Sequence, residues 1–527
     1  MQRKHRLMWI RDKKDIMWDK SRYQDFYTIR ERSMQGGGQA KIDKQHNAGK
    51  LTARERLNIL FDPGTFVEIG GTIETRISDF GMDQKKNPGD GVVTGYGRID
   101  GRLVFAFSED FTVIGGTLGE AHARKICAIQ DMALEMMAPI IMINDSGGAR
   151  IEEGVCSLSG YAGMFLRNTT ASGVIPQIAV IMGPCAGGAC YSPAICDYVF
   201  MVENTSYMFI TGPKVVKTAT GETITTDALG GAEIHMEKSG VAHFSYPDDK
   251  SCLEAVRQLL CYLPENTRKH PPVVKGTPVD RAAEIEQIVP QNQRKPYDVR
   301  AVIETMVDQG SFLEVQASWA RNAVIGFGRI DGEVVGFVAN QPDYMGGSLD
   351  CNSSDKMARF IRSCDCFNIP LVVLVDVPAF LPGSKQEHDG IIRHGAKLLY
   401  AFSEATVPKI SLIMRKAYGG AYIAMNSKLM GADMVFAWPI AEIAVMGAEG
   451  AVEIMCQKEI AAAPERREQI IEDYKERFLN PYLAAARGYI DEIIEPADTR
   501  KRIAYALQML SGKSRALTSK KHGNIPL

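Results

Sequence analysis

The sequence predicts an α/β protein made of two similar domains in tandem, and three observations indicate this fold class. Short apolar runs of strand length alternate with longer stretches that have the periodicity of helices. The pattern of the first half of the chain returns in the second half, as in a duplicated domain. A proline-rich stretch separates the two copies.

Alternating apolar segments indicate the elements of both copies. Residues 120–136 space their apolar side chains as a helix does. Residues 140–143 (IIMI) and 178–182 (IAVIM) have the length and composition of buried strands. Residues 410–414 (ISLIM) are the counterpart of the second of these strands in the other copy. We therefore expect strands and helices to alternate in the same order in both halves.

The repeat keeps its register over a long distance. Residues 97–101 (GRIDG) recur unchanged at 328–332, an offset of 231 residues (328 − 97). The same offset relates Asp145 to Asp376. Chance similarity does not hold register over such a length, so we expect these residues to occupy equivalent positions of two homologous folds.

The domain boundaries follow from composition. We predict a first domain at 20–265, a linker at 266–297 and a second domain at 298–520, with a mostly helical tract from 465 to 509 that is interrupted near Pro481. The linker contains several prolines among charged and polar residues, namely Pro271, Pro272, Pro278, Pro290 and Pro296.

Composition argues against several classes of function. Lys and Arg number 61 and Asp and Glu 63, so no basic excess indicates a nucleic-acid or anionic-membrane partner. No apolar run approaches the roughly 20 residues of a spanning helix. The 11 cysteines lie in apolar segments without a secretory signal, which is typical of reduced thiols in a cytoplasmic protein. The basic N-terminus carries Asp12 and Asp15 and fits a transit peptide poorly, but a mitochondrial matrix location stays open.

Common catalytic signatures are absent from the sequence. There is no Gly-x-Ser-x-Gly elbow, and Gly512-Lys513-Ser514 lacks the earlier glycine of a P-loop, which argues against ATP chemistry in this chain. No Cys-x-x-Cys or His-Glu-x-x-His occurs, so we expect no metal. His388 and His394 lie in a charged stretch, where a solvated or supporting role and general-base catalysis are both open.

Glycine pairs placed directly after strands offer a different chemistry. Gly147-Gly148 follows the first of the strands named above, and Gly187-Gly188 and Gly419-Gly420 follow the next strand of each copy, now offset by 232 residues (419 − 187). Glycine lets a ligand approach the backbone, and the first N–H groups of a helix have no internal partner. Such groups can hold the oxygen of a thioester enolate or of a ureido anion. The alternative is that these glycines only permit tight turns or close packing, which a duplicated fold would also repeat.

At these residues the sequence resembles the carboxyltransferase subunits of propionyl-CoA and other acyl-CoA carboxylases, and it is closely similar to the methylmalonyl-CoA-using subunit of transcarboxylase. The similarity runs from about residue 35 to the tail. The strings that carry it are DGVVTG at 90–95, DSGGAR at 145–150, GPCAGGA at 183–189, GIIRHGAK at 390–397, KAYGGAY at 416–422 and AVMGAEG at 444–450.

The resemblance implies two tandem crotonase-like (ClpP/crotonase) domains, the first binding an acyl-CoA and the second receiving biotin. The expected activity is carboxyl transfer between carboxybiotin and the α carbon of a short-chain acyl-CoA, with propionyl-CoA or methylmalonyl-CoA as the expected substrate. The expected oxyanion-hole donors are Gly187, Gly188, Gly420 and Ala421. The expected substrate-binding residues are Gly147, Gly148, Ala186, Gly419, Tyr422 and Ile423. Backbone N–H groups would hold both enolates, so no side-chain base is needed, and which hole serves biotin is open.

One position departs from the family pattern. Ile423 stands where propionyl-type carboxylases usually place Asp, at a position that helps to set acyl-chain preference in the family. Ile423 therefore either lines the acyl pocket or fills a core position.

The resemblance also implies partners. The chain lacks an Ala-Met-Lys-Met attachment sequence, so biotin must come on a separate biotin carboxyl carrier protein, with a biotin carboxylase subunit as a further possible partner. The family forms hexamers, so we expect a homo-oligomer. Two alternatives are open: the α-subunit of a biotin-dependent acyl-CoA decarboxylase, which runs the same chemistry in reverse, and a non-catalytic crotonase-like scaffold.

Overall fold

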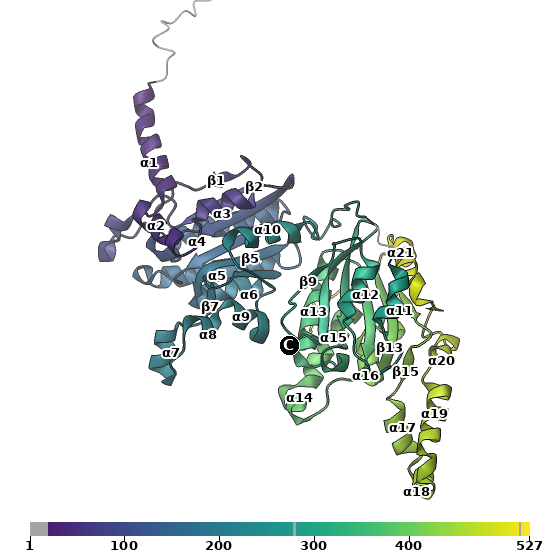
Figure 1. The fold of residues 1–527 in the computed structure, drawn as a ribbon. Coiled ribbons are helices and arrows are strands. Elements are labelled where there is room, and N and C mark those ends of the chain that lie inside the picture. The colour runs from purple at the N-terminus through teal and green to yellow at the C-terminus, as the bar shows by residue number, and fades with distance from the viewer. Residues whose placement is uncertain (1–18, 278–280, 516–517) are drawn as a thin grey trace, which may run out of the picture.

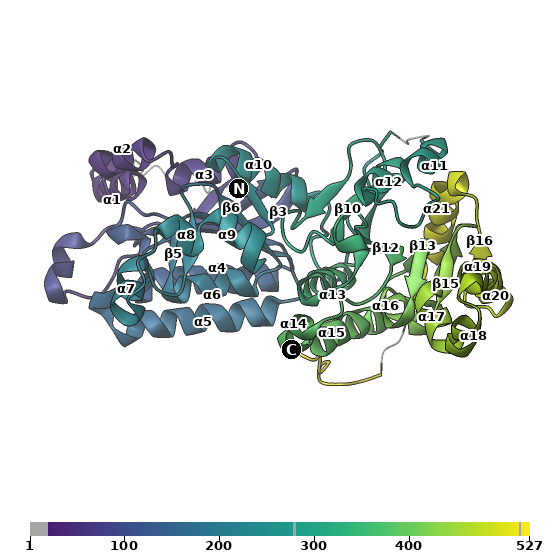
Figure 2. The same ribbon diagram turned by 60° about the horizontal axis from the view of Figure 1, so that its bottom comes forward.

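The computed structural model describes residues 19–277, 281–515 and 518–527, so the acidic residues Asp12 and Asp15 of the N-terminus lie outside the described residues. The chain folds into two α/β halves that lie side by side (Figure 1). Each half contains an eight-stranded sheet with helices packed against it (Figure 2). This arrangement confirms the predicted α/β class and its duplication.

The first sheet has the order β1-β2-β3-β4-β5-β6-β8, and β7 pairs with β5. β1, β2 and β3 pair antiparallel, and all the other pairs are parallel. The strands are β1 Val67–Ile69, β2 Val92–Ile99, β3 Arg102–Glu109, β4 Ile140–Ser146, β5 Gln177–Ala186, β6 Tyr198–Val202, β7 Tyr207–Phe209 and β8 Phe244–Tyr246. The helices are α1 Gln24–Gln35, α2 Gln39–Asn47, α3 Ala53–Leu60, α4 Glu120–Glu135, α5 Val155–Ala171, α6 Tyr191–Ile195, α7 Pro213–Thr220, α8 Thr226–Gly230, α9 Ala232–Ile234 and α10 Asp249–Leu260.

The second sheet repeats this topology strand for strand, with the order β16-β14-β13-β12-β11-β10-β9 and with β15 beside β13. The strands are β9 Leu313–Val315, β10 Ala323–Ile330, β11 Glu333–Asn340, β12 Leu371–Val377, β13 Lys409–Tyr418, β14 Met434–Ala437, β15 Glu442–Ala444 and β16 Glu492–Ile493. The helices are α11 Ile285–Ile288, α12 Val299–Met306, α13 Cys351–Cys366, α14 Ser384–Asp389, α15 Ile391–Glu404, α16 Gly419–Ala424, α17 Ala448–Met455, α18 Gln457–Ala462, α19 Arg467–Phe478, α20 Pro481–Ala486 and α21 Thr499–Leu510.

The predicted elements agree with these bounds. The helix expected at 120–136 is α4, and the three expected strands are β4, β5 and β13. The helical tract near the C-terminus breaks between α19 and α20 as expected, where the Asn480 side chain caps a helix that begins at Pro481. A second, unpredicted break lies between α20 and α21, where β16 joins the sheet. The change of offset from 231 to 232 falls in the crossover from β12 to β13, because that connection is one residue longer than the one from β4 to β5.

The two halves share a hydrophobic core. One cluster of buried side chains continues from the first sheet into the second. Across the boundary, the Tyr198 and Ser363 hydroxyls lie 2.8 Å apart, and the Tyr262 hydroxyl donates to the Ser311 carbonyl at 2.7 Å. The boundaries at 266 and 297 stay a prediction, but the stretch between them is not a free tether, because Ile285 is buried in the core of the second half.

Helical extensions project from opposite ends of the molecule. α1 extends from the first half, and α17, α18 and α19 extend from the far end of the second half (Figure 1). Within the described ranges, no helix combines the length and the apolar character needed to cross a bilayer.

Candidate active site

Each half ends its central parallel strand in a glycine turn. β5 leads into Gly187 and β13 leads into Gly419, and both residues have a positive φ, 63° and 58°. A short helix begins at each turn, the 3₁₀ turn Gly187–Cys190 and α16, and no side chain caps either one. The first N–H groups of both helices are therefore available to an oxygen atom of a ligand.

The second glycine of each turn has different surroundings in the two halves. A Cβ built on Gly188 would lie 2.9 Å from the Tyr161 ring, so glycine is needed here for packing. A Cβ built on Gly420 meets nothing within 4 Å. Close packing therefore explains Gly188, whereas no described residue packs closely against Gly420, so this position leaves room for a ligand to approach the backbone.

A β-bulge precedes each turn. Asp145 of β4 stands opposite residues 182–184 of β5, and Asp376 of β12 stands opposite 414–416 of β13. Both carboxylates are fully buried. Bulges re-aim a strand near its end, and these two bulges direct the chain into the glycine turns. The offset of 231 residues between Asp145 and Asp376 therefore identified the same bulge in both halves.

In the first half, cations from outside the sheet neutralise the buried aspartate. Lys50 lies 2.7 Å and Arg56 2.9 Å from the Asp145 carboxylate. Arg56 also donates to the Met182 carbonyl at 2.8 Å, which fixes the bulged strand. Gly183 leaves room for this cluster, since a Cβ there would lie 1.9 Å from an Asp145 oxygen.

In the second half, the cation comes from the strand itself. Arg415, the counterpart of Gly183, pairs with Asp376 at 2.8 Å. The backbone N–H of Lys416 donates to the same carboxylate at 3.1 Å, which its counterpart Pro184 cannot do. Arg415 also donates to three carbonyls of the expected linker, those of Pro290, Asn292 and Lys295.

The structure brings three of the expected substrate-binding residues together. A Cβ on Gly148 would lie 2.9 Å from the Ala186 carbonyl, so the loop after β4 reaches the turn after β5. The N–H groups of this loop are already used, because Gly147 donates to the Gly115 carbonyl at 3.0 Å and Gly148 to the Ser146 hydroxyl at 3.2 Å. These two glycines can therefore offer a ligand close contact but no free backbone donor.

The residues that follow the second turn differ in exposure. Ala421 is buried, and Tyr422 packs partly against the main core. Ile423 is 46% exposed. The interpretation of Ile423 as a core residue is therefore wrong, because α16 directs its side chain away from the sheet.

The two histidines lie in α14 and α15. His388 is exposed, and His394 lies 2.8 Å from the Asp355 carboxylate, which Lys397 also contacts at 2.9 Å. This ion-pair cluster favours a supporting role for His394 over general-base catalysis.

All eleven cysteines are free, and within the described ranges no group of three or more His, Cys, Asp or Glu side chains could hold a metal.

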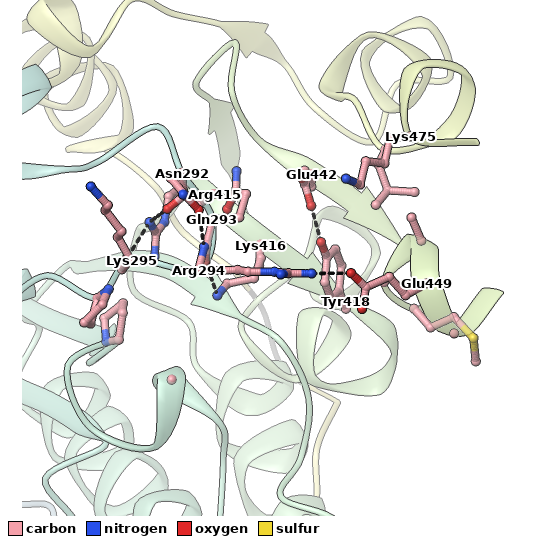
Figure 3. Close-up of a pocket in the computed structure, with 18 residues that line it drawn as sticks. Asn292, Gln293, Arg294, Lys295, Arg415, Lys416, Tyr418, Glu442, Glu449 and Lys475 are labelled. Carbon is pink, nitrogen blue, oxygen red and sulfur yellow. Dashed lines mark hydrogen bonds and ion pairs between the residues drawn. The ribbon is translucent and has the colours of Figure 1, made fainter. Parts of the chain in front are cut away.

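A cavity of about 680 Å³ lies beside the second turn (Figure 3). Residues 292–296 of the expected linker, Lys416 and Tyr418 of β13, and 447–450 at the start of α17 contribute to its wall. The sequence did not indicate that 292–296 contribute to this wall, because proline and charge there predicted a linker. The string KAYGGAY contains Lys416, so the signal for that residue was present.

Comparison with known proteins gives a consistent result. The family model described as the carboxyl transferase domain matches residues 44–525. The chain is 56% identical over 503 residues to the propionyl-CoA carboxylase carboxyltransferase subunit of Haloferax mediterranei, covering 94% of this chain and 98% of that one. It is 54% identical over 510 residues to the methylmalonyl-CoA decarboxylase subunit alpha of Propionigenium modestum, covering 96% and 98%.

A solved structure is similar over the same length. The transcarboxylase 12S hexamer with methylmalonyl-CoA and methylmalonic acid bound has a TM-score of 0.94 and 52% identity, covering 97% of this chain and 99% of that one. This likeness confirms the predicted crotonase-like fold.

Proposed function

This chain belongs to the carboxyl transferase domain family, and on that premise we propose that it transfers a carboxyl group between biotin on a separate carrier protein and the α carbon of a short-chain acyl-CoA. Propionyl-CoA and methylmalonyl-CoA are the proposed substrates, because similar proteins are named for them. One observation carries the proposal: two equivalent glycine turns with uncapped N–H groups, one in each half.

The second turn fits the ureido ring of biotin. The open space beside Gly420 lets a flat ring approach the backbone, and the N–H groups of Gly420 and Ala421 would hold the ureido oxygen. Biotin, when bound, supplies the nitrogen that carries the carboxyl group.

The first turn fits the thioester of the acyl-CoA. The N–H groups of Gly187 and Gly188 would hold the thioester oxygen and stabilise its negative charge when the α proton leaves. Loss of one such donor costs about 2.7 to 4 kcal/mol of barrier. Gly147, Gly148 and Ala186 border this turn and would shape the space around the acyl group.

We propose that each active site is shared between two copies of the chain. Each half has one turn, and the reaction needs both. An exposed apolar residue stands beside each turn: Ile210 directly after β7 is 66% exposed, and Val445 directly after β15 is 81% exposed. These equivalent positions suit a face that a neighbouring copy covers. The hexameric state of the similar transcarboxylase agrees with this arrangement.

The test is exchange of labelled carboxyl from methylmalonyl-CoA onto free biotin, run beside malonyl-CoA. We expect biotin-dependent exchange, faster with methylmalonyl-CoA. Absence of exchange, together with no heat on titration with propionyl-CoA, would support the scaffold alternative instead. Co-purification with a biotin carboxylase or with a membrane subunit separates the carboxylating direction from the decarboxylase alternative.

A further inference from the structure

We propose that the cavity beside the second turn contains an anion subsite, centred on the Lys416 ammonium, which takes the carboxylate that the reaction transfers. This inference rests on the proposed function and identifies the side chain that recognises the migrating group. The carboxylate has two possible sources, the acyl group of methylmalonyl-CoA and the ureido nitrogen of biotin.

Lys416 is placed close to the turn. It lies three residues before Gly419 on β13, roughly 10 Å along an extended strand. Its side chain is half-buried, and its ammonium donates to the Gln293 carbonyl at 3.0 Å. An ammonium has three N–H donors, so two stay available. In the part of the chain that the structure describes, no carboxylate lies within ion-pair distance of this ammonium.

The acidic groups of the cavity have hydrogen-bond or ion-pair partners, whereas within the described residues the Lys416 ammonium bonds a carbonyl and has no ion pair. Glu442 accepts a hydrogen bond from the Tyr418 hydroxyl, and Glu449 pairs with Arg294 (Figure 3). Lys295 adds positive charge to the wall, and Lys475 also lines it while pairing with Glu472 at 3.4 Å. The N-terminus of α17 lines the same cavity, and no side chain caps it. The cavity therefore presents a net positive field to a ligand.

Burial makes an anionic ligand favourable at this position. Burial lowers the pKa of Lys416; the Asp376 and Glu442 carboxylates oppose that shift, and the Arg415 guanidinium adds to it. A half-buried ammonium that bonds only a neutral carbonyl is incompletely compensated, and a carboxylate restores its charge-assisted hydrogen bonds.

The wall of the subsite is held in place. The Arg415 guanidinium is buried and bonds the Asn292 and Lys295 carbonyls, which flank Gln293 in sequence, as well as Asp376. The carbonyl that orients Lys416 is thus fixed before any ligand arrives, which is a requirement of a precise site.

The subsite exists in only one half. The counterpart of Lys416 in the first half is Pro184, which has no charged side chain. The duplication therefore supplies two oxyanion turns but only one cation of this kind, so the two turns are not interchangeable.

The test compares Lys416→Met, Lys416→Arg and wild type. Titration calorimetry measures the affinity for propionyl-CoA, which lacks the carboxylate, and for methylmalonyl-CoA, which carries it. If the acyl carboxylate occupies the subsite, Lys416→Met lowers the affinity for methylmalonyl-CoA by about 10-fold to 100-fold, as expected for a lost charge-assisted hydrogen bond. The affinity for propionyl-CoA stays within about two-fold of the wild-type value. Lys416→Arg should restore most of the affinity.

If the carboxyl group on biotin occupies the subsite, both affinities stay unchanged, and the rate at which propionyl-CoA discharges carboxylated biotin falls by a similar factor in Lys416→Met. Equal loss of affinity for both CoA esters, or no change in either assay, would overturn the proposal. Wild-type enzyme without carboxyl exchange would instead refute the proposed function.

Lys513→Met is the matched control. Its ammonium is largely buried, bonds the Val407 carbonyl at 2.8 Å and, unlike Lys416, has an ion-pair partner, Asp433 at 2.7 Å. This contact lies just before β13 begins, at the opposite end of that strand from the turn. We expect Lys513→Met to lower the thermal midpoint without changing either affinity. If Lys513→Met also lowered the affinity for methylmalonyl-CoA relative to propionyl-CoA, the effect of Lys416→Met would come from destabilised folding and not from a lost contact with the carboxylate.

Discussion

Replacing Gly420 by valine tests whether the second turn holds a ligand. A Cβ at this position meets no atom of the chain within 4 Å, and φ is not in the left-handed region. The free energy of unfolding should therefore change by less than about 1 kcal/mol. The branched side chain would occupy the space in front of the N–H groups, and loss of one oxyanion donor costs about 2.7 to 4 kcal/mol, a 100-fold to 1,000-fold decrease in kcat.

Two further glycines make the comparison informative. Gly188→Val places its side chain against the Tyr161 ring, and such overpacking costs about 1 to 3 kcal/mol of stability. Gly512→Val is the matched control, because a Cβ there also meets nothing within 4 Å, and the residue follows α21 at the surface. Gly188→Val should therefore lose stability and activity, Gly420→Val activity alone, and Gly512→Val neither.

The assay is carboxyl exchange onto free biotin, with thermal denaturation of each variant measured in parallel. If Gly420→Val folded normally and exchanged carboxyl at the wild-type rate, the second turn would not hold a ligand, and the role assigned to Gly420 and Ala421 would be refuted.

Three other expectations follow from the same structure. Ile423→Asp should change the ratio of the kcat/KM values for propionyl-CoA and acetyl-CoA, by a factor equivalent to about 1 to 3 kcal/mol of transition-state binding. An unchanged ratio in a stable variant would show that Ile423 does not line the acyl pocket. Co-expressed Gly188→Val and Gly420→Val chains should recover exchange activity that neither variant has alone, unless the sites lie within one chain; mass spectrometry verifies that mixed oligomers form. Burial raises the pKa of Glu109 to about 8 from 4.5, so unfolding releases its proton between those values and stability falls as pH rises through this window. The thermal midpoint of Glu109→Gln should therefore decline less than that of wild type from pH 5 to pH 8, and equal declines would contradict the raised pKa.

Much of the fold could be predicted from local patterns. Apolar runs and helical spacing located β4, β5, β13 and α4, because the periodicity of a buried face is recorded in neighbouring residues. The repeat identified Asp145 and Asp376 as equivalent before any contact was known. The glycine turns were found for the same reason, since a chain reversal after a strand is specified by the residues at that point.

The sequence did not predict which cations pair with Asp145 and Asp376. Lys50 and Arg56 neutralise Asp145 across about 90 positions of chain, whereas Arg415 does the same for Asp376 from the neighbouring strand. No local pattern distinguishes these two solutions, because each is completed only when separate elements pack together.

The sequence by itself determined the α/β class, the duplication, the two glycine turns and the family resemblance. Only the tertiary structure decided that Gly188 is needed for packing and Gly420 is not, that Ile423 is exposed, and that the expected linker at 292–296 forms a wall beside Lys416. The physical reason is that strands and turns depend on neighbouring residues, whereas a cavity and the charge it presents depend on which distant side chains fill the surrounding space.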